Sequence, residues 1–216
     1  MHVSELWRYP VKSLKGQALN AVELTEEGLL GDRLVHVRSR SGRVITSRTK
    51  PRLLALQGTL GPDGQALIDG RPWHAEASRA AVRAAAGDDA ELVAYDRLDR
   101  FDVLPLSVAT DGAIAAIGVD RRRFRPNILI GGVEGLAERS WPGFQLRIGE
   151  ALVAVARLRP RCVMTTYDPD TQEQDHSVLR RIVGDFGGTL ALDCAVVEPG
   201  RISLGDRVEL VRSAAA

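Results

Sequence analysis

Arg159-Pro160-Arg161-Cys162 places a thiol beside two guanidinium groups, and six residues later the chain continues with Asp168-Pro169-Asp170-Thr171. Neighbouring positive charge favours the thiolate, the form of cysteine that binds metals and attacks electrophiles. The alternative is that Cys162 is a small buried apolar residue, as many free cysteines are. The Asp-Pro-Asp run is typical of a turn, since it lacks the glycine and the final glutamate of a calcium loop. Cys162 is therefore the first candidate for a chemical role.

The second cysteine, Cys194, has a different setting. Its neighbours Asp193 and Ala195 carry no positive charge, and Leu192, Cys194 and Val196 alternate along a predicted strand. Such alternation places every second side chain on the same face of a sheet. We therefore predict that Cys194 faces the core, has a structural role and is dispensable for function.

The small number of cysteines limits the compartment and the redox chemistry. Two cysteines in 216 residues fit a reducing compartment, most simply the cytoplasm. An iron–sulfur cluster needs four cysteine ligands, so any redox chemistry would draw its electrons from another protein. The four histidines are scattered and match no zinc-site spacing, and no glycine-rich phosphate loop is present.

The composition is that of a globular protein, with 44% hydrophobic and 26% charged residues. A chain of this length forms one large domain or two small ones packed together. The formal net charge of +1 argues against general nucleic-acid binding, although local basic clusters remain. No apolar run is long enough to cross a membrane, and the N-terminus lacks the order of a secretory signal.

Short strands separated by turn residues dominate the pattern. We expect strands at residues 3–9, 18–24, 34–39, 44–47, 55–60, 66–68, 91–95, 127–130, 145–148, 151–157, 190–197 and 207–211. Helices are expected at residues 78–86, 107–117 and 177–186, the last ending at two glycines. A charged junction at 96–100 divides the chain into 1–96 and 97–216. This pattern predicts a β-rich α+β fold, a barrel or curled sheet with peripheral helices.

Two loops in the first part carry cations. The loop 9–16 offers Lys12, Ser13 and Lys15, a combination suited to an anionic ligand group, although exposed lysines in water are the simpler interpretation. The turn 28–33 ends in Arg33, which opens a predicted strand and can point into a cavity. The alternative there is an ordinary surface ion pair, which contributes little to stability.

The second part carries an arginine cluster, residues 121–125, before an apolar strand. Four arginines around one phenylalanine can indicate nucleic acid. Arg125 and Asn127 flank a proline, and a guanidinium grips a phosphate bidentately while an amide bonds to a heterocycle. That pair favours a phosphorylated, ring-containing small molecule. Ser107, at the start of a predicted helix, is a further candidate for anion binding, with plain helix capping as the alternative.

Together these motifs resemble the MOSC (molybdenum cofactor sulfurase C-terminal) family, in particular the branch that contains the amidoxime reducing components and their bacterial relatives. The resemblance rests on five motifs in order. They are Tyr-Pro-Val-Lys-Ser-x-Lys-Gly, Gly-Asp-Arg, Phe-Arg-Pro-Asn-Ile, Trp141 with Ile148-Gly149, and Arg-Cys-Val-Met-Thr-Thr-Tyr-Asp-Pro-Asp-Thr. A late segment at residues 199–206 is also similar to that branch, so the resemblance covers nearly the whole chain.

The resemblance implies a MOSC-type β-barrel core at 97–216 and an N-terminal β-barrel-like part at 1–96. It implies a molybdenum cofactor in the molybdopterin form, with Cys162 as catalytic residue and protein ligand to the molybdenum. Family positions that hold the cofactor fall on Lys12, Ser13, Arg33, Ser107, Arg125, Asn127 and Cys162. Pyridoxal phosphate binding is implied only as a general property of the family, and no residue of this chain is assigned to it.

Members of this branch reduce N-hydroxylated compounds, such as amidoximes and hydroxylamines. The resemblance therefore implies a small-molecule N-hydroxylated substrate and a separate electron donor of the ferredoxin, flavodoxin or cytochrome type. The sequence shows neither the fused ferredoxin domain of some bacterial relatives nor the membrane anchor of the mitochondrial members. We accordingly expect a cytoplasmic protein without nucleic-acid or membrane partners.

Two other functions fit the same residues. Cys162 could carry a persulfide, in which case the protein would transfer sulfur or the cofactor itself and catalyse no reduction. A binding module without catalysis, using the arginines of residues 121–125 on RNA, is the third hypothesis, and its binding would weaken strongly with salt.

Overall fold

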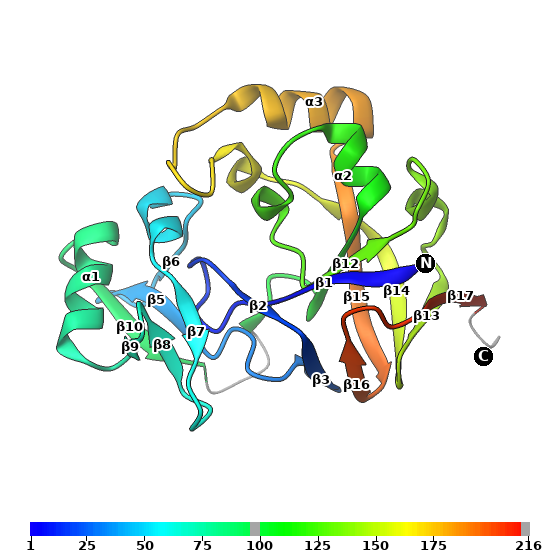
Figure 1. The fold of residues 1–216 in the computed structure, drawn as a ribbon. Coiled ribbons are helices and arrows are strands. Elements are labelled where there is room, and N and C mark those ends of the chain that lie inside the picture. Colours follow the sequence, from blue (N-terminus) through cyan, green and yellow to red (C-terminus); the bar gives the residue numbers. More distant parts are fainter. Residues whose placement is uncertain (96–99, 213–216) are drawn as a thin grey trace.

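A single large sheet organises the molecule. The computed structural model describes residues 1–95 and 100–212, and eight strands follow one another across the sheet in the order β17-β13-β14-β15-β11-β12-β1-β2 (Figure 1). These strands are β1 (His2–Arg8), β2 (Gln17–Leu19), β11 (Leu106–Thr110), β12 (Ile128–Gly131), β13 (Phe144–Ile148), β14 (Ala151–Pro160), β15 (Thr189–Glu198) and β17 (Val208–Arg212). The first strand of the chain thus pairs with β12 from its second half.

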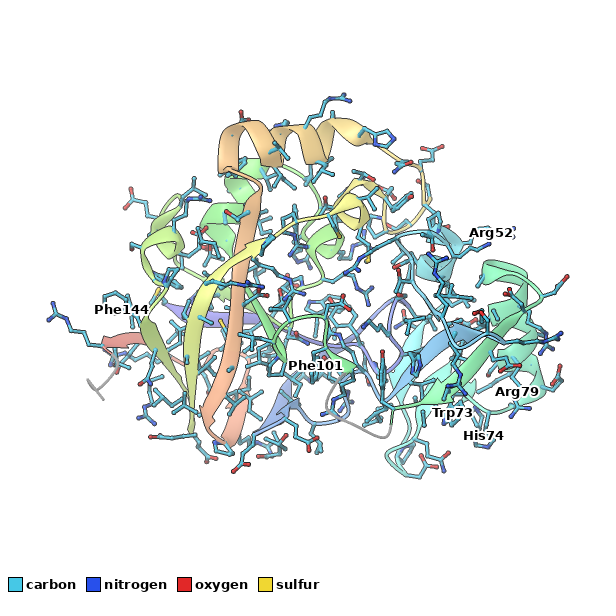
Figure 2. The ribbon with its side chains drawn as sticks, turned by 180° about the vertical axis from the view of Figure 1, so that it is seen from behind. Arg52, Trp73, His74, Arg79, Phe101 and Phe144 are labelled. Carbon is cyan, nitrogen blue, oxygen red and sulfur yellow. The ribbon has the colours of Figure 1, made fainter. Side chains whose placement is uncertain are left out.

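Three small sheets complete the strands. They are β10-β5-β6, with β5 (Val35–Ser39), β6 (Val44–Ile45) and β10 (Ala90–Ala94); β16-β3-β4, with β3 (Ala21–Thr25), β4 (Gly28–Leu29) and β16 (Gly200–Ser203); and β7-β8-β9, with β7 (Gly58–Leu60), β8 (Ala66–Ile68) and β9 (Arg71–Pro72). The first and third, with α1 (Glu76–Ala86) and the 3₁₀ helix η1 (Pro51–Ala55), form a smaller part beside the large sheet (Figure 1). Figure 2 shows Trp73, His74 and Arg79 on this part and Phe144 on the opposite side of the molecule.

Each part has its own core, because each set of elements buries a different apolar face. The large sheet buries Leu6, Ile128 and Val153 together with Cys194. The smaller part packs Val82 of α1 and other apolar side chains against β5 and η1. The strand-rich arrangement confirms the expected β-rich α+β fold with peripheral helices.

Two helices lie against central strands of the large sheet, α2 (Asp111–Ile117) beside β11 and β12, and α3 (His176–Phe186) beside β15. Ile117, Val178 and Ile182 pack with Phe124 of the short helix η3 (Arg121–Phe124) in a third cluster. The helix α3 ends as expected at Gly187, whose φ of 61° lies in the left-handed region that glycine adopts without strain. Its apolar residues at helical spacing therefore predicted it correctly.

The expected helix at 107–117 is wrong in its first part. Residues 106–110 form β11, which is buried throughout and pairs with β12 on one side and β15 on the other. Pairing in the middle of a sheet overrides local helix preference, because isolated short helices are marginal in water. The helix begins only at Asp111, and Thr110 caps it by accepting the N–H of Ala113. Ser107 is therefore a strand residue and marks no helix N-terminus.

Smaller differences concern element ends. The strand expected at 18–24 is split between β2 and β3, the one at 55–60 is shortened by η1, and the helix expected from 78 begins at Glu76. The charged junction lies outside the described residues, except for Arg100, which donates to Glu27. The division at residues 96 and 97 stays a prediction. None of the helices within residues 1–95 and 100–212 combines the length and hydropathy that a membrane span requires.

Candidate functional site

The two cysteines occupy opposite environments. Cys162 follows the end of β14, precedes the short helix η5 (Val163–Thr166), and is exposed, whereas Cys194 is fully buried in the core of the large sheet. Burial raises the pKa of the Cys194 thiol, since a thiolate there would lose its hydration. The prediction that Cys194 faces the core is confirmed, and Cys162 is the cysteine available to a ligand.

Cys162 lines a cavity of about 220 Å³ that is strongly cationic. Its walls contain seven positively charged side chains and two carboxylates. The cations are Lys12, Arg33, Arg48, Arg123, Arg125, Arg159 and Arg161, and the carboxylates are Asp102 and Asp193. Concentrating one sign of charge in a concave, partly buried site attracts anions and stabilises them there. The cavity, called the Cys162 cavity below, therefore suits an anionic ligand.

Five of the predicted site residues meet in the Cys162 cavity. Lys12 and Ser13 come from the loop after β1, Arg33 from the segment before β5, Arg125 from the end of η3, and Cys162 from the end of β14. Residues separated by up to 150 positions thus converge, which no local motif specifies. The remaining two predicted residues, Ser107 and Asn127, are buried and do not line this cavity.

The backbone is strained at three of these positions. Ser13, Arg33 and Arg125 have φ values of 75°, 52° and 51°, in the left-handed region that is unfavourable for residues other than glycine. Residues held in such conformations concentrate at ligand sites, where the surrounding structure compensates for the strain. Here they turn three polar side chains toward one cavity.

A buried hydrogen-bond network stands behind the cavity wall. Asp32 is fully buried, accepts the backbone N–H of Tyr9 at 2.6 Å and pairs with Arg33. The Asn127 amide donates to Asp32 at 3.2 Å and accepts the backbone N–H of Ser107 at 3.1 Å. Asn127 therefore positions Asp32 and, through it, Arg33, while the Ser107 hydroxyl is buried with no hydrogen-bond partner within the described structure.

Two arginines of the cavity have buried charges and form no ion pair with a carboxylate of the described residues. Burial lowers the pKa of Arg125 to about 10, and its guanidinium lies 4.1 Å from the centre of the Tyr9 ring. Burial and the neighbouring charge of Arg159 lower the pKa of Arg161 to about 9. Arg161 donates one bond to the Phe124 carbonyl at 2.8 Å, but its Nε and Nη1 are buried and have no partner in the described residues. An arginine in a protein keeps its proton at neutral pH. Both guanidinium groups therefore stay charged and can bind an anion.

Arg48 and Asp102 belong to the cavity but were not predicted. Arg48 lies in the loop after β6 and lines the cavity together with Cys162. Burial opposes its charge, but Asp102 and Cys162 outweigh that effect and raise the pKa of Arg48. Asp102 accepts from Lys12 at 2.7 Å and from Arg48 at 2.6 Å. Neither residue belongs to a recognisable motif, so only their convergence in space identifies them.

The arginine cluster of residues 121–123 is neutralised by carboxylates. Arg121 pairs with Glu5, Arg122 with Asp120 and Asp170, and Arg123 with Asp168 at 3.0 Å. Asp168 also accepts the backbone N–H groups of residues 170 and 171, which confirms the expected turn. These pairs build the loop after Cys162, and they leave no free basic stripe for RNA at residues 121–123.

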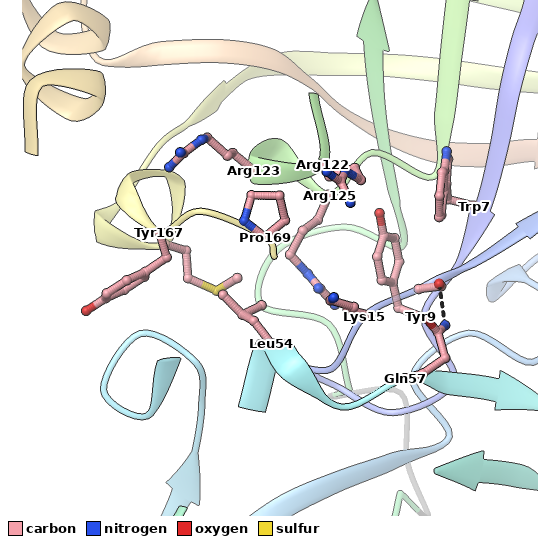
Figure 3. Close-up of a pocket in the computed structure, with 12 residues that line it drawn as sticks. Trp7, Tyr9, Lys15, Leu54, Gln57, Arg122, Arg123, Arg125, Tyr167 and Pro169 are labelled. Carbon is pink, nitrogen blue, oxygen red and sulfur yellow. Dashed lines mark hydrogen bonds between the residues drawn. The ribbon is translucent and has the colours of Figure 1, made fainter. Parts of the chain in front are cut away.

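A second cavity of about 210 Å³ adjoins the first and shares Arg123, Arg125 and Met164 with it. Trp7, Tyr9 and Leu54 are among its more apolar walls. Figure 3 shows the Arg125 side chain beside the Tyr9 ring in this cavity. Among the described residues, no histidine or cysteine lines this second cavity. The candidate metal ligand therefore lies in the Cys162 cavity.

Replacing Arg161 by methionine should stabilise the protein without ligand by about 1 kcal/mol, because it removes a buried charge that lacks an anionic partner. The matched control is Arg159→Met, which should destabilise the protein, because Arg159 pairs with the fully buried Asp193. Urea denaturation of both ligand-free variants measures the two free energies of unfolding. Equal destabilisation by both changes would show that Arg161 is already compensated.

Comparisons with known proteins identify relatives of this chain. At 28% identity, mitochondrial amidoxime reducing component 2 from Bos taurus aligns over 78% of this chain and 67% of its own length. Mitochondrial amidoxime-reducing component 1 from Homo sapiens aligns at 25% identity over 97% of this chain and 82% of its own length.

The structure also resembles the crystal structure of the YuaD protein from Bacillus subtilis, with a TM-score of 0.54 and 13% identity over 99% of this chain and 96% of that one. At this identity the likeness concerns the fold alone. Two family models match the sequence, the MOSC N-terminal beta barrel domain at residues 1–98 and the MOSC domain at residues 84–209. Since the second match spans more than half of the residues, the chain belongs to the MOSC domain family.

Proposed function

We propose that this protein is a molybdenum-cofactor-dependent reductase of N-hydroxylated compounds, such as amidoximes and hydroxylamines. The observation that carries the proposal is the exposed sulfur of Cys162 in a cavity with seven cations and two carboxylates. The names of the relatives, amidoxime reducing components, support the same reaction class.

The residues of the Cys162 cavity fit a phosphorylated pterin that carries a metal. The partnerless guanidinium nitrogens of Arg161 and the surplus of cations match an anionic group. A thiolate is the soft ligand that a molybdenum centre suits. Within the described residues no three His, Cys, Asp or Glu side chains converge, so Cys162 would be the protein ligand and the cofactor would supply the other donors.

Each residue of the cavity then has a defined task. Cys162 would hold the metal, and Arg48, which lines the same cavity, would add positive charge beside it. Lys12, Ser13, Arg33, Arg125 and Arg161 would hold the anionic tail and the pterin. Asn127 would act from behind the wall by orienting Asp32. When bound, the cofactor supplies the two-electron chemistry of N–O cleavage, and the chain binds, orients and tunes it.

Elemental analysis with reductant-driven turnover tests this function. Protein purified from a host that makes the cofactor should contain close to one molybdenum per chain, and with reduced viologen it should convert an aromatic amidoxime to the amidine. A wild-type protein that contains neither metal nor pterin under these conditions would overturn the proposal.

The exposure of Cys162 also favours a second candidate, transfer of sulfur or of the cofactor through a persulfide on this residue. Both a persulfide carrier and a metal ligand need an accessible sulfur that can react as the thiolate. Mass spectrometry that detects a persulfide on Cys162, together with bound cofactor and no reductase turnover, would select the carrier. Turnover with an unmodified Cys162 would select the reductase.

A further inference from the structure

An open groove of about 1000 Å³ runs along β5, β6 and the loop 46–50 of the smaller part. This surface is called the β5–β6 groove below, and Figure 1 labels the two strands that border it. Its rim residues Arg43, Val44 and Lys50 are exposed. Apart from Lys12 and Arg48, which also line the Cys162 cavity, the proposed function gives its residues no role.

The β5–β6 groove has a surplus of positive charge. Five cations line it (Lys12, Arg38, Arg43, Arg48 and Lys50), against Asp89 and Asp102. Asp102 is already paired with Lys12 and Arg48. No carboxylate in residues 1–95 and 100–212 lies within ion-pair distance of the other three cations, Arg38, Arg43 and Lys50. In a chain with a net charge of +1, this is a local concentration of unpaired charge.

The groove is continuous with the Cys162 cavity. Lys12, Thr46, Arg48 and Asp102 line both. The loop 46–50 also contacts the segment after Cys162, since the Ser47 hydroxyl donates to the Met164 sulfur at 3.2 Å. Arg48 spans the boundary, because it lines both the groove and the Cys162 cavity. A molecule in the groove would therefore lie one side chain away from the candidate metal ligand.

We propose that the β5–β6 groove docks the acidic face of a small one-electron carrier protein, an inference that rests on the proposed function. Reduction of an amidoxime, R–C(NH₂)=N–OH + 2e⁻ + 2H⁺ → R–C(NH₂)=NH + H₂O, breaks one N–O bond and consumes two electrons. Two cysteines cannot form a cluster that stores them. Two carrier molecules, each oxidised by one electron, balance the reaction, with both protons taken from water.

A protein fits this surface better than a small anion. The groove is wide and open, its cations are spread along a rim, and Val44 places an apolar side chain with 44% of its surface exposed among them. Protein interfaces combine arginine and apolar side chains in this way. Complementary charge across such an interface accelerates encounter and sets the orientation of the partner.

The test compares two electron sources in the cofactor-loaded protein. A reduced plant-type [2Fe–2S] ferredoxin with an acidic surface is the protein donor, and reduced methyl viologen is the small donor. The double variant Arg43→Glu/Lys50→Glu should lower ferredoxin-driven kcat/KM at least about tenfold, since reversed charges repel an acidic partner. Viologen-driven turnover should stay unchanged, because neither residue lines the Cys162 cavity.

The matched control is Arg180→Glu/Arg181→Glu on the exposed face of α3, which should leave both rates unchanged. Rising salt should slow ferredoxin-driven turnover of the wild type more than that of the groove variant. Equal losses in the groove and α3 variants, or no loss in either, would overturn the docking site.

If the proposed function is incorrect, the cofactor-loaded protein will show no turnover even with reduced methyl viologen, and this result is distinct from a failure of docking. Ferredoxin binding by calorimetry then decides the docking site: binding to the wild type but not to the groove variant upholds it, and equal binding overturns it. Salt-dependent binding of single-stranded RNA that the groove variant loses, without ferredoxin binding, would also overturn it.

Discussion

Replacing Cys162 by serine should remove molybdenum from the purified protein and lower amidoxime turnover at least about 100-fold. Changes that merely disturb the surroundings of a metal ligand already cost about 10–100-fold, and this change removes the soft sulfur itself. The stability of the fold should be nearly unaffected, because Cys162 is exposed and contributes little to the core. Metal analysis, viologen-driven kinetics and urea denaturation of one preparation measure the three quantities.

Cys194→Ala is the matched control, because it deletes the other sulfur of the chain. It should retain the metal and activity while losing about 1–2 kcal/mol of unfolding free energy, since it leaves a small cavity in the core of the large sheet. If Cys194→Ala loses the metal while folding well, or Cys162→Ser retains it, the assignment of Cys162 as ligand is incorrect.

Replacing Asp32 by alanine should lower the free energy of unfolding by about 3–5 kcal/mol, the loss typical of removing one partner from a buried charged pair. Asp32 is fully buried and connects three elements of the site wall. Without it Arg33 loses its buried partner, and the N–H of Tyr9 and the amide of Asn127 lose their acceptors. Urea denaturation of the ligand-free protein measures the effect on stability.

The control for Asp32 is Asp88→Ala, at an exposed position after α1. Substitution there should change stability by less than about 0.5 kcal/mol, as expected for a surface residue without partners. If Asp32→Ala is as mild as Asp88→Ala, the network does not hold the wall. If Asp32→Ala is strongly destabilising, metal content in folded protein should fall as well, because Arg33 and Asn127 are no longer held in place.

Local sequence predicted the elements whose side chains follow a regular period. The helix α3 places Val178, Ile182 and Phe186 on one face and ends at Gly187, so periodicity and a terminator sufficed. The core position of Cys194 was predicted from the alternation of Leu192, Cys194 and Val196, although Asp193 between them is fully buried as well. Such signals depend on residues close in the chain, which is why they were visible without a structure.

Ser107 shows where this approach failed. Its segment has apolar residues that suit either a helix or a buried strand, and pairing with β12 and β15 selected the strand. Gly112, in the first turn of α2, allows the segment at residues 133–135 to pack closely against the helix, because a side chain there would collide with the carbonyl oxygens of Val133 and Gly135. The competing strands lie 20 and more than 80 residues away, so no local window contained the deciding contacts.

The amino-acid sequence determined the strand-rich class, the family and the distinction between the two cysteines, because these depend on composition, ordered motifs and near neighbours. Tertiary structure alone decided that Arg48 and Asp102 join the wall beside Cys162, that Asn127 acts from behind it, and that the arginines of residues 121–123 are neutralised. Charge and hydrogen-bond partners are properties of atoms a few ångströms apart, and only the folded chain determines which distant residues become such neighbours.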